Sequence, residues 1–219
     1  MIPVRILRLN SESDKPGPAL EIASILRAGG VMVFPTDTFY GLGANALSAA
    51  AVEKIYTLKG RPRSKALSVV VADLDQAKSV VSDPPPVLDE LAAEFWPGPL
   101  TLTLKARPVF PPDLLGPGGT IALRVPAVPW LRGLLRAAGF PVTATSANVS
   151  GEGELDDFEA VRRVFEGRVD LLVDGGRTPG GASSTIVDLS GESPRLVREG
   201  IVPWVRIHSY LGRTPGPRR

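Results

Sequence analysis

Short apolar runs with the length of a β-strand, separated by stretches with helical spacing, limit the folds open to this chain. The run at residues 31–34 contains no polar residue and ends at Pro35, as expected for a central strand buried on both faces. Residues 19–28 instead carry apolar side chains at helical spacing and stop at a pair of glycines. The chain therefore mixes buried strands with amphipathic helices.

The same two patterns recur along the whole chain and predict its architecture. Strands are predicted at residues 4–9, 31–34, 67–71, 100–105, 121–125, 142–145, 169–173, 185–189 and 195–198. Helices are predicted at residues 19–28, 49–59, 87–95, 130–138 and 158–165. Strands and helices do not alternate strictly, which indicates an α/β or α+β domain with a twisted, mixed sheet and flanking helices, not a doubly wound fold.

Four further expectations accompany this architecture. Residues 36–45 are expected to form a polar loop, and Thr101 and Thr103 are expected to point outward from their strand. The domain is expected to span residues 1–200, followed by a basic, proline-rich and loosely ordered tail at 201–219. His208 is expected on the surface.

Composition narrows the possible chemistry. A hydrophobic content of 43% supports a core, no apolar run reaches the ~20 residues of a membrane span, and the N-terminus lacks a signal pattern, so a cytoplasmic protein is expected. There is no cysteine and only one histidine, which argues against thiol, zinc–thiolate and serine–histidine chemistry. Any catalysis is therefore expected to rely on positioning and electrostatics, without a structural metal.

Basic residues gather between positions 54 and 65. This stretch holds Lys54, Lys59, Arg61, Arg63 and Lys65 and no acidic residue, although the net charge of the whole chain is only +2. A dense basic patch on a nearly neutral protein indicates a polyanionic ligand such as a nucleoside triphosphate or RNA. The alternative is a solvated helix end, since Lys59 is predicted to end a helix and Arg61 to lie in the next loop.

Two polar loops follow apolar strands. One begins at Thr36 and the other at Ser146, and in open sheets ligands bind beyond the ends of the strands. Each loop alone is as compatible with a self-bonded turn. No phosphate-binding loop of the G-x-x-x-x-G-K-[ST] type is present, and the glycines at 41–43 match a dinucleotide fingerprint only weakly.

Six short motifs occur in a fixed order along the chain. They are P-T-D-T-F-Y-G-L-G from residue 35, K-G-R-P from 59, F-W-P-G-P-L-T-L from 95, A-L-R-V-P from 122, T-S-A-N-V-S-G from 145 and S-S-T-I-V-D-L from 183. Together they resemble the YrdC/TsaC-type threonylcarbamoyl-AMP synthases over roughly residues 20–200. The resemblance implies a YrdC-like fold around a large basic cavity. It also implies condensation of L-threonine, bicarbonate and ATP, with Mg2+, for threonylcarbamoyl-adenosine modification of tRNA.

The resemblance also implies roles for individual residues. Lys59 and Arg61 are the implied catalytic residues. The implied ATP contacts are Lys59, Arg61, Thr120, Ala144, Ser146, Asn148 and Arg198. The implied threonine contacts are Thr36, Arg124 and Ser184. The alternative for Arg124, a charged residue on a predicted strand, is a buried salt bridge to one of the chain's own carboxylates. The chain departs from the family pattern at Ala66, where proline is usual, at Ser183, where an acidic residue is common, and at Glu154, near a position where a hydroxyl residue often contacts the nucleotide.

Two other functions remain open. A pure RNA-binding protein would use the basic patch without ATP, although the aromatic content of 6% and the lack of an RNP-type motif weigh against it. A carbamoyl-transferring or YciO-like paralogue would share the fold without synthase activity, but the K-G-R and S-A-N segments favour the synthase. A tRNA and a downstream tRNA threonylcarbamoyl-transfer complex are the expected macromolecular partners.

Overall fold

Two mixed β-sheets form the centre of the protein. The structure is a computed structural model in which residues 4–9 and 16–211 are described. The strands are β1 (Arg5–Arg8), β2 (Val31–Pro35), β3 (Tyr40–Ala44), β4 (Ser68–Val70), β5 (Leu100–Lys105), β6 (Thr120–Arg124), β7 (Val142–Thr143), β8 (Thr145–Ser146), β9 (Leu171–Asp174), β10 (Thr185–Asp188) and β11 (Arg195–Arg198). The helices are α1 (Pro16–Arg27), α2 (Ala49–Lys59), α3 (Leu74–Ser79), α4 (Val87–Phe95), α5 (Pro129–Ala138), α6 (Phe158–Phe165) and α7 (Trp204–His208), with a 3-10 turn η1 (Pro112–Leu114).

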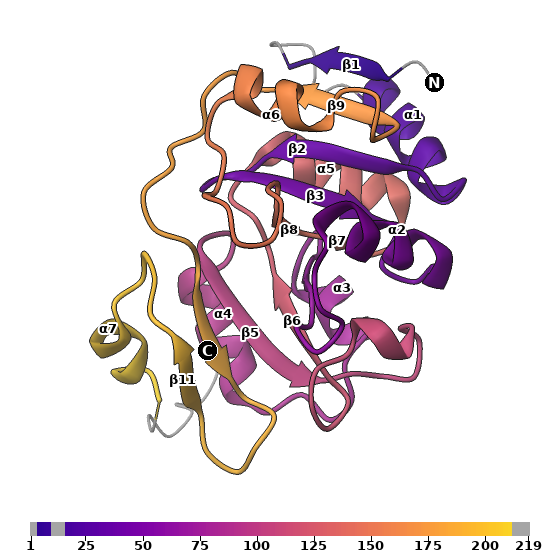
Figure 1. Ribbon diagram of the computed structural model, residues 1–219. Coiled ribbons are helices and arrows are strands. Elements are labelled where there is room, and N and C mark those ends of the chain that lie inside the picture. Colours follow the sequence, from indigo (N-terminus) through magenta and orange to yellow (C-terminus); the bar gives the residue numbers. More distant parts are fainter. Residues whose placement is uncertain (1–3, 10–15, 212–219) are drawn as a thin grey trace.

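The strand order shows how distant parts of the chain meet. One sheet has five strands in the order β1-β9-β2-β3-β8, and the other has six in the order β11-β10-β5-β6-β4-β7. In Figure 1 the first sheet occupies the upper half of the molecule and the second the lower half. Both contain parallel and antiparallel pairs. The predicted mixed α/β class is confirmed, but the single predicted sheet is in fact two.

The chain passes between the two sheets within one short segment. Residues 142–145 were expected to form one strand, yet β7 pairs with β4 in the six-stranded sheet and β8 pairs with β3 in the five-stranded sheet. Ala144 lies between them, and its N–H donates to the carbonyl of Ser68 at 2.8 Å. This crossing joins the two sheets.

The loop predicted at residues 36–45 is only half correct. Residues 40–44 form β3, which pairs antiparallel with β2 and is buried along its whole length. Its glycines had indicated a turn. Instead, a Cβ on Gly43 would lie 2.6 Å from the Phe34 ring and 2.7 Å from the Thr143 carbonyl oxygen, so the glycine permits a close approach.

All five predicted helices are confirmed, and two further α-helices were missed. Helix α2 is capped by Ser48, whose hydroxyl accepts from the Ala51 N–H, and ends at Gly60 with φ of 57°. Helices α3 and α7 were not predicted. Helix α7 contradicts the loosely ordered tail in this region because Ile207 is fully buried. His208 is exposed, as predicted, and residues 212–219 lie outside the described part.

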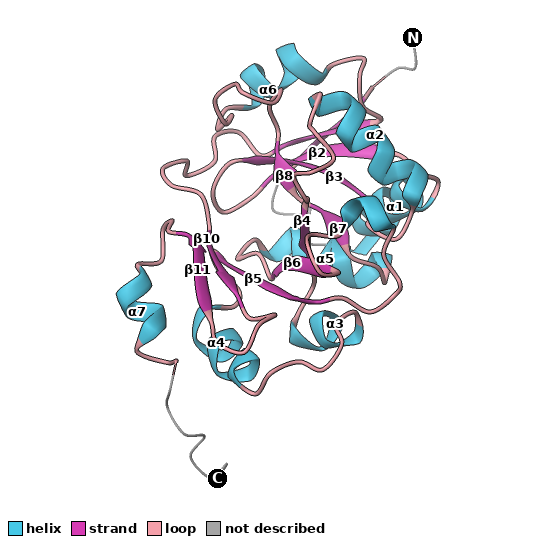
Figure 2. Cartoon of the chain, turned by 60° about the horizontal axis from the view of Figure 1, so that its bottom comes forward, coloured by secondary structure: helices cyan, strands magenta, loops and turns pink. Residues whose placement is uncertain are grey.

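Helices flank the two sheets, as Figure 2 shows. Helices α1 and α5 pack against each other and, with β2, bury a cluster that includes Ile22, Leu26, Phe34 and Leu134. Burying each such side chain contributes about 1.5–3 kcal/mol. Among the described residues, no helix is long and apolar enough to cross a membrane. The alternate side chains Val31 and Val33 of β2 belong to a second cluster with α2, so both faces of the five-stranded sheet are packed.

Candidate active site

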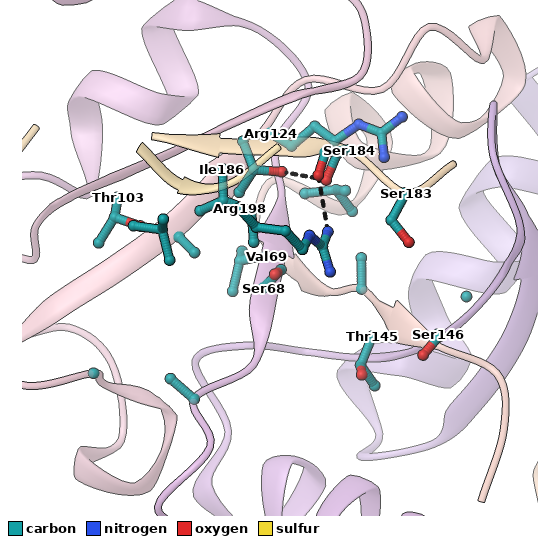
Figure 3. A pocket seen from close by; sticks show the side chains of 18 of the residues that line it. Ser68, Val69, Thr103, Arg124, Thr145, Ser146, Ser183, Ser184, Ile186 and Arg198 are labelled. Atoms are coloured by element: carbon teal, nitrogen blue, oxygen red, sulfur yellow. Dashed lines mark hydrogen bonds between the residues drawn. The ribbon is translucent and has the colours of Figure 1, made fainter. Parts of the chain in front are cut away.

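A cavity of about 720 Å³ lies between the two sheets. The five-stranded sheet contributes β3 and β8 to its wall, and the six-stranded sheet contributes β4, β5, β6, β10 and β11. Figure 3 shows side chains from these strands facing the space. This volume lies in the range of small-molecule sites and exceeds what a single amino acid needs.

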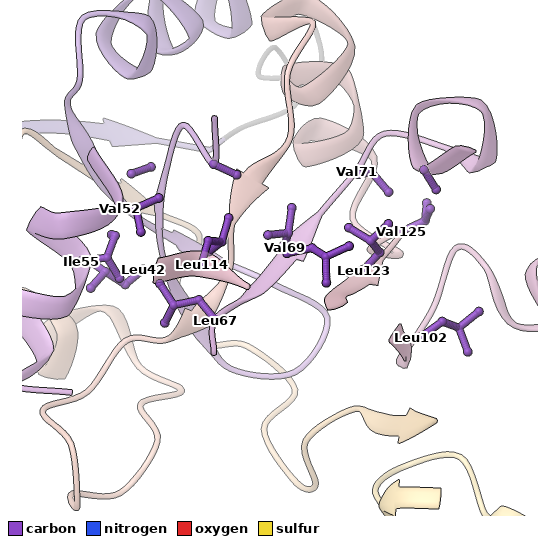
Figure 4. Close-up of a cluster of buried hydrophobic side chains, with 14 of the residues drawn as sticks. Leu42, Val52, Ile55, Leu67, Val69, Val71, Leu102, Leu114, Leu123 and Val125 are labelled. Atoms are coloured by element: carbon purple, nitrogen blue, oxygen red, sulfur yellow. The ribbon is translucent and has the colours of Figure 1, made fainter. Parts of the chain in front are cut away.

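Strand alternation builds the wall. On β6, Thr120, Ala122 and Arg124 line the cavity, while the intervening Leu123 is fully buried in the hydrophobic core shown in Figure 4. Thr101 and Thr103 on β5 also line the cavity. The predicted alternation is confirmed, because the leucines of β5 lie in the core and the threonines lie on the opposite face, which borders the cavity.

The charges on the wall are mainly positive. Arg61, Arg124, Arg195 and Arg198 line the cavity, against the carboxylates of Glu154 and Asp188. Asp188 is ion-paired with Arg195 at 3.2 Å. Of the described residues, no group of three or more His, Asp or Glu side chains is arranged to hold a metal ion. The cavity thus favours anions, and a Mg2+ ion would depend mostly on oxygens of its ligand.

Eight of the ten residues implied by the motifs share this cavity. They are Thr36, Arg61, Thr120, Arg124, Ala144, Ser146, Ser184 and Arg198. The two others, Lys59 and Asn148, are buried and do not line it. The fold therefore brings together residues from segments up to 162 positions apart (198 − 36).

The predicted surface patch at residues 54–65 is not a single surface. Lys59 ends helix α2, as predicted, but it is only 1% exposed and does not belong to a surface patch. Arg63 forms ion pairs with Glu53 and Asp113, and Lys54 donates to the Gly29 carbonyl at 2.7 Å. Of the five basic residues only Arg61 lines the cavity. A helix turn spreads neighbouring side chains in different directions, which a linear count of charges does not reveal.

Lys59 donates all three of its N–H bonds to one turn. Nζ contacts the carbonyl oxygens of Ser146 and Asn148, the latter at 2.9 Å, and the side-chain oxygen of Asn148 at 2.8 Å. Ser146 Oγ donates to the same Asn148 oxygen at 2.8 Å. The pKa of Lys59 is lowered to about 8, mainly by burial. The positive charge of Arg61 lowers this pKa as well, and its effect is larger than the opposite effect of Glu154. Lys59 therefore fixes the backbone and side chains of the Ser146–Asn148 turn.

Arg61 is held against the wall by backbone carbonyls. Its Nε donates to the Lys65 carbonyl and its Nη2 to the Ala66 carbonyl, both at 3.0 Å. The residue at 66, one of the departures from the family pattern, thus contributes through its main chain. These bonds fix the guanidinium while leaving further N–H donors for a ligand.

Arg124 is anchored by partners that the sequence did not identify. Its Nε donates to the Gly98 carbonyl at 2.9 Å, and its Nη2 forms an ion pair with Asp37. A charged residue on a buried strand requires such a partner. The signal for Asp37 was its position in the P-T-D-T run directly after β2.

Hydroxyl groups surround the neighbouring part of the cavity. Ser184 Oγ shares a hydrogen bond of 2.9 Å with Thr101 Oγ1, and Arg198 Nη2 donates to the Ser184 carbonyl at 2.9 Å, as Figure 3 shows. Ser183 Oγ donates to the Glu154 carboxylate at 2.8 Å. These two departures from the family pattern therefore contact each other, so a hydroxyl and a carboxylate still meet here.

Comparison with known proteins agrees with this geometry. A family model for Sua5, YciO and YrdC, described as "Telomere recombination", matches residues 24–200. The threonylcarbamoyl-AMP synthase of Pyrococcus abyssi is 38% identical over 190 residues, which are 87% of this chain and 56% of that protein. This chain therefore spans little more than half the length of that relative.

Solved structures show the same fold. The crystal structure of P. abyssi Sua5 complexed with L-threonine aligns with a TM-score of 0.87 at 36% identity, covering 95% of this chain and 61% of that one. Escherichia coli YciO aligns with a TM-score of 0.80 at 30% identity, covering 92% of this chain and 97% of that one. The motifs, the cavity and these matches agree, and the chain belongs to the Sua5/YciO/YrdC family.

Proposed function

We propose that this protein is a threonylcarbamoyl-AMP synthase, which condenses L-threonine, bicarbonate and ATP to threonylcarbamoyl-AMP and pyrophosphate. One observation carries the proposal: residues from all six motifs meet on the wall of a single, mainly basic cavity. The similarity to relatives named as this synthase supports it. The proposal covers the reaction, its substrates and its partners.

The chemistry suits a site without histidine or cysteine. The amine of threonine adds to carbon dioxide from bicarbonate and loses a proton, which gives a carbamate. A carbamate oxygen then attacks the α-phosphorus of ATP, the bond to the β-phosphate oxygen breaks, and pyrophosphate leaves. The nucleophile is already anionic, so the step requires alignment and charge neutralisation more than a general base. Mg2+ carried by the triphosphate supplies part of that neutralisation.

The wall residues divide between the two substrates. Arg61 and Arg198 neutralise the phosphates, and Ser146, Thr120 and the backbone at Ala144 position the nucleotide. Thr36, Arg124 and Ser184 hold the amino acid. Lys59 and Asn148 act from behind the wall by fixing the turn that presents Ser146.

Pyrophosphate release from ATP is the test. The purified protein should release pyrophosphate only when ATP, L-threonine and bicarbonate are all present. A second candidate is a YciO-like protein without this activity, which the structural match to YciO favours. Absence of threonine-dependent release, with ATP binding retained, would favour that candidate. RNA binding that is sensitive to salt and independent of ATP would favour a pure RNA-binding protein.

The chemistry of the product indicates which reaction must follow. Threonylcarbamoyl-AMP is a mixed anhydride, so a transferase must pass its acyl group to an acceptor. We propose that the acceptor is an adenosine of tRNA, that a tRNA threonylcarbamoyl-transfer complex consumes the product, and that the protein acts in the cytoplasm.

A further inference from the structure

Asp37 lies beside the cavity without lining it. Its neighbours Thr36 and Thr38 both line the cavity, whereas Asp37 contacts the Arg124 guanidinium within the wall. The Asp37 and Arg124 side chains are only 15% and 10% exposed. The contacting atoms, Asp37 Oδ1 and Arg124 Nη2, are sealed from solvent. The short segment between β2 and β3 therefore directs two hydroxyls to the ligand space and one carboxylate behind it.

The nitrogens of Arg124 have different partners. Nε donates to the Gly98 carbonyl, and Nη2 is paired with Asp37. Within the described residues, no hydrogen bond involves Nη1. Arg124 nevertheless lines the cavity, so Nη1 is the nitrogen left for an anion there. The protein's own groups thus bind two of the three guanidinium nitrogens, and Nη1 remains available to a ligand.

A buried guanidinium keeps a fixed orientation only when a counter-charge holds it there. Removal of one partner from a buried ion pair leaves the other charge uncompensated, which is strongly unfavourable. Without Asp37, Arg124 would keep one of these two partners, the Gly98 carbonyl, and could rotate toward water in the cavity. A rotated guanidinium would no longer present Nη1 at a fixed place.

We propose that Asp37 is a positioning residue for the amino-acid half of the site. It holds Arg124 so that Nη1 is presented to the carboxylate of the amino-acid substrate, while Thr36 and Ser184 border the same space. This inference rests on the proposed synthase function. In this proposal the Asp37 carboxylate sets the orientation of the Arg124 guanidinium, and that guanidinium binds the carboxylate of the substrate.

The test is Asp37→Asn, which keeps the shape and removes the charge. The matched control is Asp113→Asn, because Asp113 also pairs with an arginine, Arg63, but neither residue lines the cavity. Threonine-dependent pyrophosphate release is measured while threonine and ATP are varied separately. In Asp37→Asn the KM for threonine should rise about 10- to 100-fold, as expected when a charge-assisted contact is lost. The KM for ATP should stay within about twofold, and the control should match the wild type.

Two further variants separate positioning from simple loss of fold. Asp37→Glu keeps the charge but displaces it, so it should fold and still raise the threonine KM selectively. In an Arg124→Lys background, Asp37→Asn should add little to the threonine KM, because the two residues act as one unit. If Asp37→Asn does not fold, Asp37→Glu decides the question by the same split between the two KM values.

Several outcomes would overturn the inference. An unchanged threonine KM, or an equal rise in both KM values, would show that Asp37 has only a general structural role. A lower threonine KM would show that Asp37 competes with the substrate for Arg124. If the wild type shows no threonine-dependent release, the proposed function fails first and this inference fails with it.

Discussion

Arg61 and Arg63 stand two positions apart and meet entirely different partners. Arg61 lines the cavity and is held by the Lys65 and Ala66 carbonyls. Arg63 is an exposed residue paired with carboxylates outside the cavity. The two form a natural comparison, because the same substitution at each changes the local charge equally.

Arg61→Ala should lower kcat/KM for synthesis about 30- to 1,000-fold, since loss of one phosphate contact costs roughly 2–4 kcal/mol in the transition state. Arg63→Ala should retain nearly normal activity, because an exposed ion pair contributes about 0–1 kcal/mol to stability. Pyrophosphate release measures both. Equal losses in the two variants would mean that overall charge, not the cavity contact, matters.

Lys59 should make binding at the proposed nucleotide site depend on pH. Its pKa of about 8 means that the ammonium loses a proton as the pH rises through 8, and a neutral amine retains only two N–H donors for three oxygens. Affinity for a non-hydrolysable ATP analogue should therefore fall above about pH 8. Titration calorimetry at pH 7, 8 and 9 measures this affinity.

Two variants test whether Lys59 causes this dependence. Lys59→Met should bind the analogue more weakly at pH 7 and show no decline between pH 7 and 9. Lys54→Met removes an ammonium that donates to the Gly29 carbonyl and does not line the cavity, so it should keep the decline of the wild type. A decline that persists in Lys59→Met would assign the titration to another group.

At the scale of single elements, β3 shows how a glycine-rich segment becomes a buried strand. Gly43 faces Phe34 on β2 and the crossing between β7 and β8, where no side chain fits. Gly133 is the opposite case, since it lies inside helix α5 and a Cβ there would have nothing within 4 Å. One glycine is required by packing and the other is not.

Gly43→Ala should destabilise the protein by about 1–3 kcal/mol or more, because its Cβ would overlap the Thr143 carbonyl and Val142. Gly133→Ala should stabilise it by about 0.5–1 kcal/mol, since alanine loses less entropy in a helix. Denaturant unfolding measures both. A Gly43→Ala variant as stable as the wild type would show that β2 and β3 can separate without cost.

Sequence patterns predicted those helices and strands whose conformation is set by neighbouring residues along the chain. The apolar run of β2 and the capped helix α2 were recognised from sequence because neighbours along the chain define them. Strand β3 and the division of residues 142–146 were missed, since their pairing partners decide their conformation. The helix at 204–208 was missed because prolines and charges obscure the burial of Ile207.

The same distinction applies to the site. Motif order identified eight residues that share the cavity. It did not reveal that Lys59 lies behind the wall, because its acceptors stand 87 and 89 positions away. Nor did it show that Asp37 is the counter-charge of Arg124. Such contacts exist only once both sheets are assembled.

At the scale of the whole molecule, the cavity depends on two loops that approach from different sheets. The loop after β8 carries Glu154, the loop before β10 carries Ser183, and the two side chains form a hydrogen bond. Since the family pattern commonly places an acidic residue at 183 and a hydroxyl near 154, this chain is interpreted as exchanging the two groups.

An exchange can be tested by reversing it. Ser183→Glu alone places two carboxylates together and should reduce kcat/KM about 3- to 30-fold, while Glu154→Ser alone should have a smaller effect. The double variant Glu154→Ser with Ser183→Glu restores a hydroxyl–carboxylate pair and should recover to within about threefold of the wild type. Additive losses in the double variant would show that the two positions act independently.

The strand order of the five-stranded sheet also affects how the protein is made. Within the part of the chain that the structure describes, strand β1 has a single neighbour, β9, and residues 5–8 pair with residues 171–174. During synthesis from the N-terminus, the first strand must therefore wait until about three quarters of the chain has been translated. At about 5–20 residues per second this interval lasts roughly 10–30 s. Throughout it, the start of the chain stays without its partner strand on the ribosome.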